Sequence, residues 1–116
     1  MSNPEADLDR ITRCFASRVG TWFAEHASFP TAELDERGAG GPASVEQLTF
    51  LRQTNMTLAL VASKWSEFRT LDGAGAVGRM HAWLDEVEAR AEVRGALARA
   101  EAIRQARAWF DACAAP

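Results

Sequence analysis

Apolar residues recur every three or four positions along three long segments of the chain, a spacing that places them on one face of an α-helix. The first segment covers residues 7–27, and Asn3 followed by Pro4 is a credible start, because Asn caps helices and Pro suits their first turn. Pro30 ends it, since the residue before a proline disfavours helix. The apolar stripe of this segment consists of Leu8, Ile11, Phe15, Val19, Trp22 and Phe23.

A second helix is predicted from Ser44 to about Thr70. Ser44 with Gln47 forms a capping box, in which each side chain satisfies a free backbone N–H of the first turn. We expect the helix to run unbroken through Thr54, because its stripe keeps phase there. Asn55 falls on this stripe, where it either fixes the register between helices or across a dimer, or faces solvent. The stripe consists of Val45, Leu48, Leu51, Leu58, Val61, Trp65 and Phe68.

The last segment begins near Ala76, after an Asp72-Gly73 turn, and continues to about Cys113 as one helix or two. Gly95 and a loss of phase near Ala91 favour a kink or break. Between the first two helices, residues 28–43 contain three glycines and two prolines and are predicted to be a flexible linker. The pattern therefore predicts a single all-α domain over residues 1–116, a bundle of three long or four shorter helices.

Composition and charge narrow the class of protein. The 116 residues are 47% hydrophobic and 25% charged, which is typical of a globular chain. A net charge of −3 excludes the strongly basic surface of a general nucleic-acid binder. No apolar run approaches the roughly 20 residues that a membrane span requires, and the acidic N-terminus shows no signal-peptide pattern. We therefore expect a soluble cytoplasmic protein without nucleic-acid or membrane partners, and the abundance of Ala and Arg favours a GC-rich bacterial genome.

The sequence offers little for catalysis or metal binding. His81 and Asp85 are one helical turn apart and could share an ion, but no third ligand is evident. Cys14 lies beside an apolar face and is expected to behave as a small hydrophobe, whereas Cys113 is the more exposed thiol, with no base nearby. We predict no catalytic residues, no cofactor and no metal site.

Arginines recur through the last segment but alternate with glutamates, which predicts a solvent-exposed face of mixed charge rather than an anion site. The basic residues are Arg90, Arg94, Arg99, Arg104 and Arg107, and the acidic ones are Glu88, Glu92 and Glu101.

Two surfaces are candidates for binding. A row of small residues on the last segment ends in a tryptophan and would let another helix approach closely, so it is the predicted interface; the alternative is that a kink folds the segment back and buries the row inside one chain. This row includes Ala98, Ala102, Ala106 and Trp109. The second candidate is an aromatic pocket that could take a small apolar ligand, built from Trp22, Asn55, Trp65 and Trp83.

The stretch His81–Arg90, followed by Val93 and Ala96–Ala98, resembles the end of the helical domain of glutathione transferases. Thr54–Leu60 is a weaker match to the capped core helix of that family, with Thr57 in place of its buried Asp. The resemblance covers residues 54–102 and implies a helical accessory domain. No glutathione-binding residue carries over, because the half of the family that holds most of them has no counterpart here.

These observations favour a protein–protein interaction or accessory protein that associates with itself or with another protein. The alternative is a small-molecule-binding or enzyme accessory module with a Trp-lined pocket, distantly similar to glutathione transferases. An exposed apolar patch would favour the first function, and an enclosed cavity would favour the second.

Overall fold

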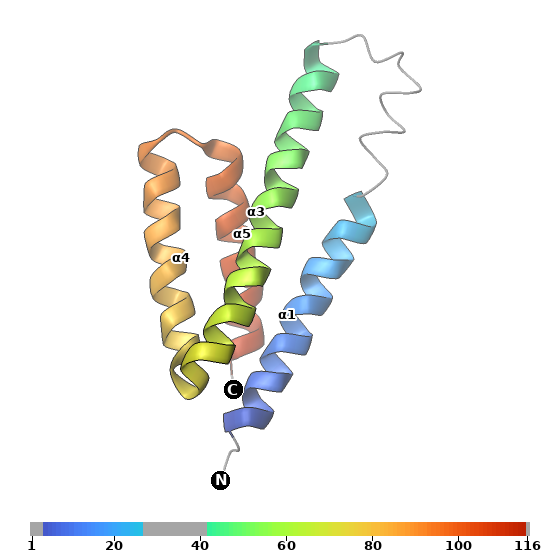
Figure 1. The fold of residues 1–116 in the computed structure, drawn as a ribbon. Coiled ribbons are helices and arrows are strands. Elements are labelled where there is room, and N and C mark those ends of the chain that lie inside the picture. Colours follow the sequence, from blue (N-terminus) through green and yellow to red (C-terminus); the bar gives the residue numbers. More distant parts are fainter. Residues whose placement is uncertain (1–3, 27–41, 116) are drawn as a thin grey trace.

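The computed structural model describes residues 4–26 and 42–115, and within these ranges the chain is an all-α bundle without strands (Figure 1). Its elements follow one another as α1 (Pro4–His26), α3 (Pro42–Asp72), the 3₁₀-helix η1 (Gly73–Gly75), α4 (Ala76–Val93) and α5 (Leu97–Ala114). The all-α prediction is confirmed, with four helices. The linker predicted at residues 28–43 falls almost entirely outside the described residues.

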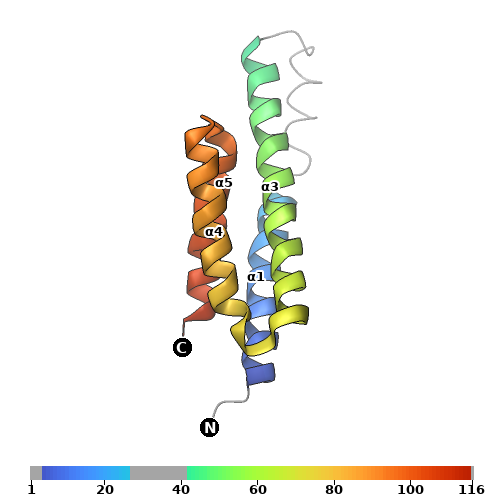
Figure 2. The ribbon, with the colours of Figure 1, turned by 60° about the vertical axis from the view of Figure 1, so that its left-hand side comes forward.

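The four helices run alternately up and down, so neighbours along the chain are antiparallel (Figures 1 and 2). α3 and α5 pack against each other as a central pair, and α1 and α4 each contact both of them from opposite sides. Among the described residues, no helix is long and apolar enough to cross a membrane.

The apolar stripes predicted from the sequence form the core except at the start of α3, where Val45 is 54% exposed and Leu48 and Leu51 are half-buried outside it. Phe110 of α5 lies at its centre, with the ring of Phe15 from α1 at 5.7 Å and that of Trp65 from α3 at 4.9 Å, both edge to face. Trp65 is only 1% exposed, as its position on the stripe predicts. These aromatic pairs tie α5 to both long helices and contribute specific geometry beyond the area that they bury.

α3 is continuous from Pro42 to Asp72, which confirms the expected passage through Thr54 without a break. It starts two residues before the predicted cap, with a proline in its first turn. Its 31 residues exceed the 18 of α4 and of α5. As a result, the N-terminal end of α3 stands clear of the turn between α4 and α5 (Figure 1).

A tight turn at Gly95 makes the last segment two helices rather than one. The N–H of Ala96 donates to the carbonyl of Ala91 at 2.9 Å and that of Gly95 to Glu92 at 3.1 Å, the hydrogen-bond pattern of a Schellman motif. Gly95 has φ +68°, a left-handed conformation that glycine adopts without steric cost. The predicted break is therefore confirmed, and it turns α5 back along α4.

Cys14 and Cys113 form a disulfide that joins α1 to α5. The expectation that Cys113 is an exposed thiol is wrong, because it is 1% exposed and bonded. The two cysteines are 99 residues apart, so only the packing of the first helix on the last brings them together.

Candidate functional site

The predicted interface on α5 lies inside the bundle. Ala98, Ala102 and Ala106 are all buried, and Trp109 is half-buried against the core. The prediction of an exposed interface here is therefore wrong. The Gly95 turn folds α5 back, so that its row of small residues serves close packing within one chain.

The four residues of the predicted aromatic pocket do not form one site. Trp65 is in the core, and Trp22 is half-buried beside a shallow hollow of about 380 Å³ that it lines with Trp109. Trp83 lines a different cavity, between α3 and α4. Asn55 is half-buried on α3, and its Oδ1 has no hydrogen-bond partner among the described residues.

Apolar side chains are exposed at the end of the bundle where the longer helix α3 extends past α4 and α5 (Figure 1). Phe50, Thr54, Thr57 and Val61 follow one another at intervals of four, three and four, so they share one face of α3. Thr54, Thr57 and Val61 are buried, whereas Phe50 is 45% exposed. Phe50 thus lies on the same face of α3 as the buried stripe but is itself partly exposed.

The turn below Phe50 is also apolar and exposed. Val93 at the end of α4 is 88% exposed, and Leu97 at the start of α5 is 74% exposed. Residues 42–53 are the first twelve residues of α3, and we call them the tip; Figure 1 shows the start of α3 standing clear of the α4–α5 turn. We call the surface that Phe50, Val93 and Leu97 expose at this end of the bundle the apical corner (Figure 1).

The tip carries both apolar and polar side chains. Successive helical residues are about 100° apart, so Val45, Leu48 and Leu51 lie on one side of the tip and Phe50 lies apart from them. Polar residues occupy the side opposite Leu51, namely Glu46, Thr49 and Gln53. Val45 is 54% exposed, and Leu48 and Leu51 are half-buried among the described residues.

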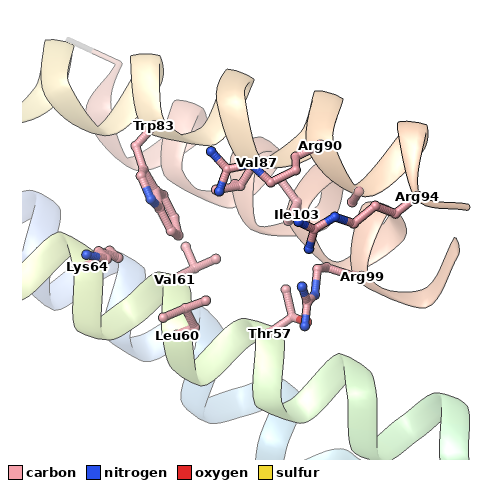
Figure 3. A pocket seen from close by; sticks show the side chains of 11 residues that line it. Thr57, Leu60, Val61, Lys64, Trp83, Val87, Arg90, Arg94, Arg99 and Ile103 are labelled. Carbon is pink, nitrogen blue, oxygen red and sulfur yellow. The ribbon is translucent and has the colours of Figure 1, made fainter. Parts of the chain in front are cut away.

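A second feature is a cavity of about 340 Å³ between α3, α4 and the start of α5 (Figure 3). Its floor is apolar, with the indole of Trp83 facing Leu60 and Val61 across it. Its rim carries cationic side chains, with Arg94 and Arg99 near the α4–α5 turn. The complete lining is Thr57, Leu60, Val61, Lys64, Trp83, Val87, Arg90, Ala91, Arg94, Arg99 and Ile103.

The arginines of the last two helices separate into two groups, which their alternation with glutamate in the sequence did not reveal. Arg104 bridges Glu88 and Glu92, and Arg107 bridges Glu88 and Asp85. The hydrogen bonds that Arg104 donates to Glu92 and Glu88 raise its pKa.

Arg90, Arg94 and Arg99 line the cavity. Arg79 at the start of α4 pairs with Asp72 instead. Arg90 is paired with Glu86 of its own helix. Arg94 and Arg99 make no ion pair with any described residue. The predicted face of mixed charge is therefore confirmed only for the residues that form ion pairs. The carboxylates of α4 pair with Arg90, Arg104 and Arg107 and leave none for Arg94 or Arg99.

His81 and Asp85 do not act together. His81 Nδ1 lies 3.4 Å from Asp111 of α5, and Asp85 is paired with Arg107. The part of the chain that the structure describes contains no group of three side chains able to hold a metal ion. The two candidate sites in the described residues are therefore the apolar surface at the end of the bundle and the apolar cavity with a cationic rim.

Comparisons with protein-family profiles, with curated proteins and with solved structures found no match to this chain. The resemblance of residues 54–102 to glutathione transferases stays a prediction.

Proposed function

We propose that this protein acts through protein–protein interaction, as a homodimer joined at the apical corner. The observation that supports this proposal is that three large apolar side chains, those of Phe50, Val93 and Leu97, are exposed at the end of the bundle where α3 begins and α4 turns into α5 (Figure 1). An exposed apolar patch is typical of an interface, because burying it against a partner removes apolar surface from water.

A second copy fits this shape. In a twofold arrangement the tip of one copy lies in the apical corner of the other, and the same contact is repeated in reverse. Each tip then covers Val93 and Leu97 of its partner, and its own exposed Val45 and Phe50 are covered in return. A foreign helix would cover one corner but would not use the tip and the corner together.

Sedimentation velocity on three proteins tests the proposal. Leu97→Asp places a charge in the corner, and Leu71→Asp is the matched control, because Leu71 is 71% exposed at the other end of α3. We expect the wild type and Leu71→Asp to be dimers and Leu97→Asp to be a folded monomer. A wild type that stays monomeric up to about 1 mM, where even −4 kcal/mol of binding would be visible, overturns the proposal.

The cytoplasm remains our proposal for the location, and the disulfide provides its test. Reducing conditions in the cytoplasm keep most cysteines as thiols, whereas oxidising compartments preserve disulfides. Acid quenching of intact cells, followed by alkylation under denaturing conditions and mass spectrometry, should therefore find Cys14 and Cys113 as thiols, because the cytoplasm would keep their disulfide reduced. Full protection of both cysteines, with recovery of the Cys14–Cys113 linked peptide, would instead place the protein in an oxidising compartment.

A further inference from the structure

We propose that the cavity between α3, α4 and the start of α5 binds a small amphipathic carboxylate, an apolar chain or ring that carries one carboxylate group. This proposal concerns a different surface from the apical corner and does not depend on self-association. It is carried by three observations, namely the apolar floor, the unpaired arginines at one end, and the size of the cavity.

The floor provides a place for an apolar group. Val61 and Ile103 are buried to 1% exposure or less, and Trp83 and Val87 are half-buried beside them. Figure 3 shows the Trp83 indole directed into the cavity toward Val61, opposite Leu60 on α3. Leu60 is 47% exposed, so a ligand tail on this floor would remove further apolar surface from water.

The end near the α4–α5 turn provides a place for an anion. Arg94 and Arg99 enter the rim from either side of the Gly95 turn, and neither has a carboxylate partner among the described residues. The neighbouring Glu92 and Glu101 both face Arg104 instead, at 2.6 and 3.7 Å. Two guanidinium groups without a partner can donate several charge-assisted hydrogen bonds to a carboxylate.

The opposite end of the cavity is less cationic. Lys64 lies there and is paired with Glu67 at 3.2 Å. The unpaired positive charge is thus confined to the turn end, which orients a ligand with its carboxylate at Arg94 and Arg99 and its tail on Trp83. A volume of about 340 Å³ is near the lower limit of small-ligand sites, about 300–1,000 Å³. The site therefore favours a small carboxylate over a nucleic acid, which would need a longer basic track.

Calorimetric titration with four probes tests the chemistry of the site. Decanoate carries both the tail and the anion, 1-decanol only the tail, inorganic phosphate only the anion, and decyltrimethylammonium the tail with the opposite charge. We expect decanoate to bind at least about tenfold more tightly than decanol, because the charge-assisted hydrogen bonds are lost in the alcohol. Absence of decanoate binding, or equal affinity for decanol or phosphate, overturns the proposal.

A pair of double variants tests the position of the site. Arg94→Gln with Arg99→Gln should reduce decanoate affinity at least about tenfold. Arg13→Gln with Arg18→Gln removes the same charge from exposed positions on α1 and should leave the affinity unchanged. Equal affinity in both double variants would overturn the proposal. Circular dichroism of each variant confirms that the helices are intact.

A third variant separates this site from the apical corner. Phe50→Ser removes the α3 side chain of the corner, and Phe50 is not part of the cavity lining. Decanoate should bind this variant as tightly as the wild type, even if the variant is monomeric. Loss of binding in parallel with loss of the dimer would overturn an independent carboxylate site and leave the dimer proposal standing.

Discussion

The indole Nε1 of Trp65 donates a hydrogen bond to Thr12 Oγ1 at 2.9 Å, and this contact joins α3 to α1. Arg69 donates to the same oxygen at 3.0 Å, while the Thr12 hydroxyl donates to the Leu8 carbonyl at 2.7 Å. One threonine hydroxyl thus satisfies the polar atom of the largest buried side chain. A buried N–H without such a partner is costly, so this pair fixes the packing of the two long helices.

Thr12→Val removes that hydroxyl with little change in shape. We expect the free energy of unfolding to fall by about 1–3 kcal/mol, because Trp65 Nε1 loses its acceptor in a buried position. Thr70→Val is the matched control, since the Thr70 hydroxyl is exposed and bonds only to the Ser66 carbonyl one turn earlier. Its effect should stay within about 0.5 kcal/mol in urea denaturation. Equal losses in the two variants would contradict this role for Thr12.

The disulfide should stabilise the fold by linking its first and last helices. Replacing both Cys14 and Cys113 by Ser should lower the free energy of unfolding by about 2–5 kcal/mol, because the bond restricts a very long loop in the unfolded chain. Urea denaturation with and without dithiothreitol measures the effect. The reductant should destabilise the wild type and leave the double variant unchanged. A wild type insensitive to complete reduction would show that the bond contributes nothing.

The Gly95 turn should tolerate no side chain without cost. Gly95→Ala forces alanine into φ +68° and should destabilise the protein by about 1–2 kcal/mol, although an added Cβ would meet no atom within 4 Å. Gly78→Ala is the control, because Gly78 lies exposed within α4 with open space around it. That change should stabilise the helix by about 0.5–1 kcal/mol. Thermal denaturation should show opposite shifts, and shifts of the same sign would contradict this account of the turn.

The glutamate that links the two arginine bridges should matter more than an exposed one. Glu88 has a side chain only 16% exposed and contacts both Arg104 and Arg107, whereas Glu86 pairs only with Arg90 at the surface. We expect Glu88→Gln to cost about 1–2 kcal/mol and Glu86→Gln less than about 0.5 kcal/mol. Urea denaturation at low and high salt provides the comparison. A greater loss for Glu86→Gln would contradict this assignment of the charges.

The fold was predictable because its signals are local. The stripes that contain Phe15 and Trp65 gave the helices and their buried faces, and Gly95 marked the break in the last segment. What could not be predicted depends on distant packing. The Cys14–Cys113 bond needs the first helix against the last, and no spacing in the sequence encodes it.

The candidate sites depend on relative helix length and register in the same way. Phe50 is absent from the predicted stripe, and its place on the same face as the buried Thr54, Thr57 and Val61 became evident only from the structure. Arg94 and Arg99 alternate with glutamates along the chain, and only the packing of α4 on α5 directs those glutamates elsewhere. The same packing buries Ala102 and Ala106, which the spacing alone places on an open face.

The most direct test of the dimer is cross-linking between two variants that each carry one added cysteine. Gln47→Cys lies on the tip and Leu97→Cys in the apical corner, and the native cysteines are already paired. After subunit exchange and mild oxidation, we expect a disulfide-linked dimer from the mixture of these two variants. Leu71→Cys mixed with Leu97→Cys should give none, because Leu71 lies at the far end of α3. No cross-link in the first mixture, or equal cross-linking in both, would contradict a dimer in which the tip of one copy lies in the apical corner of the other.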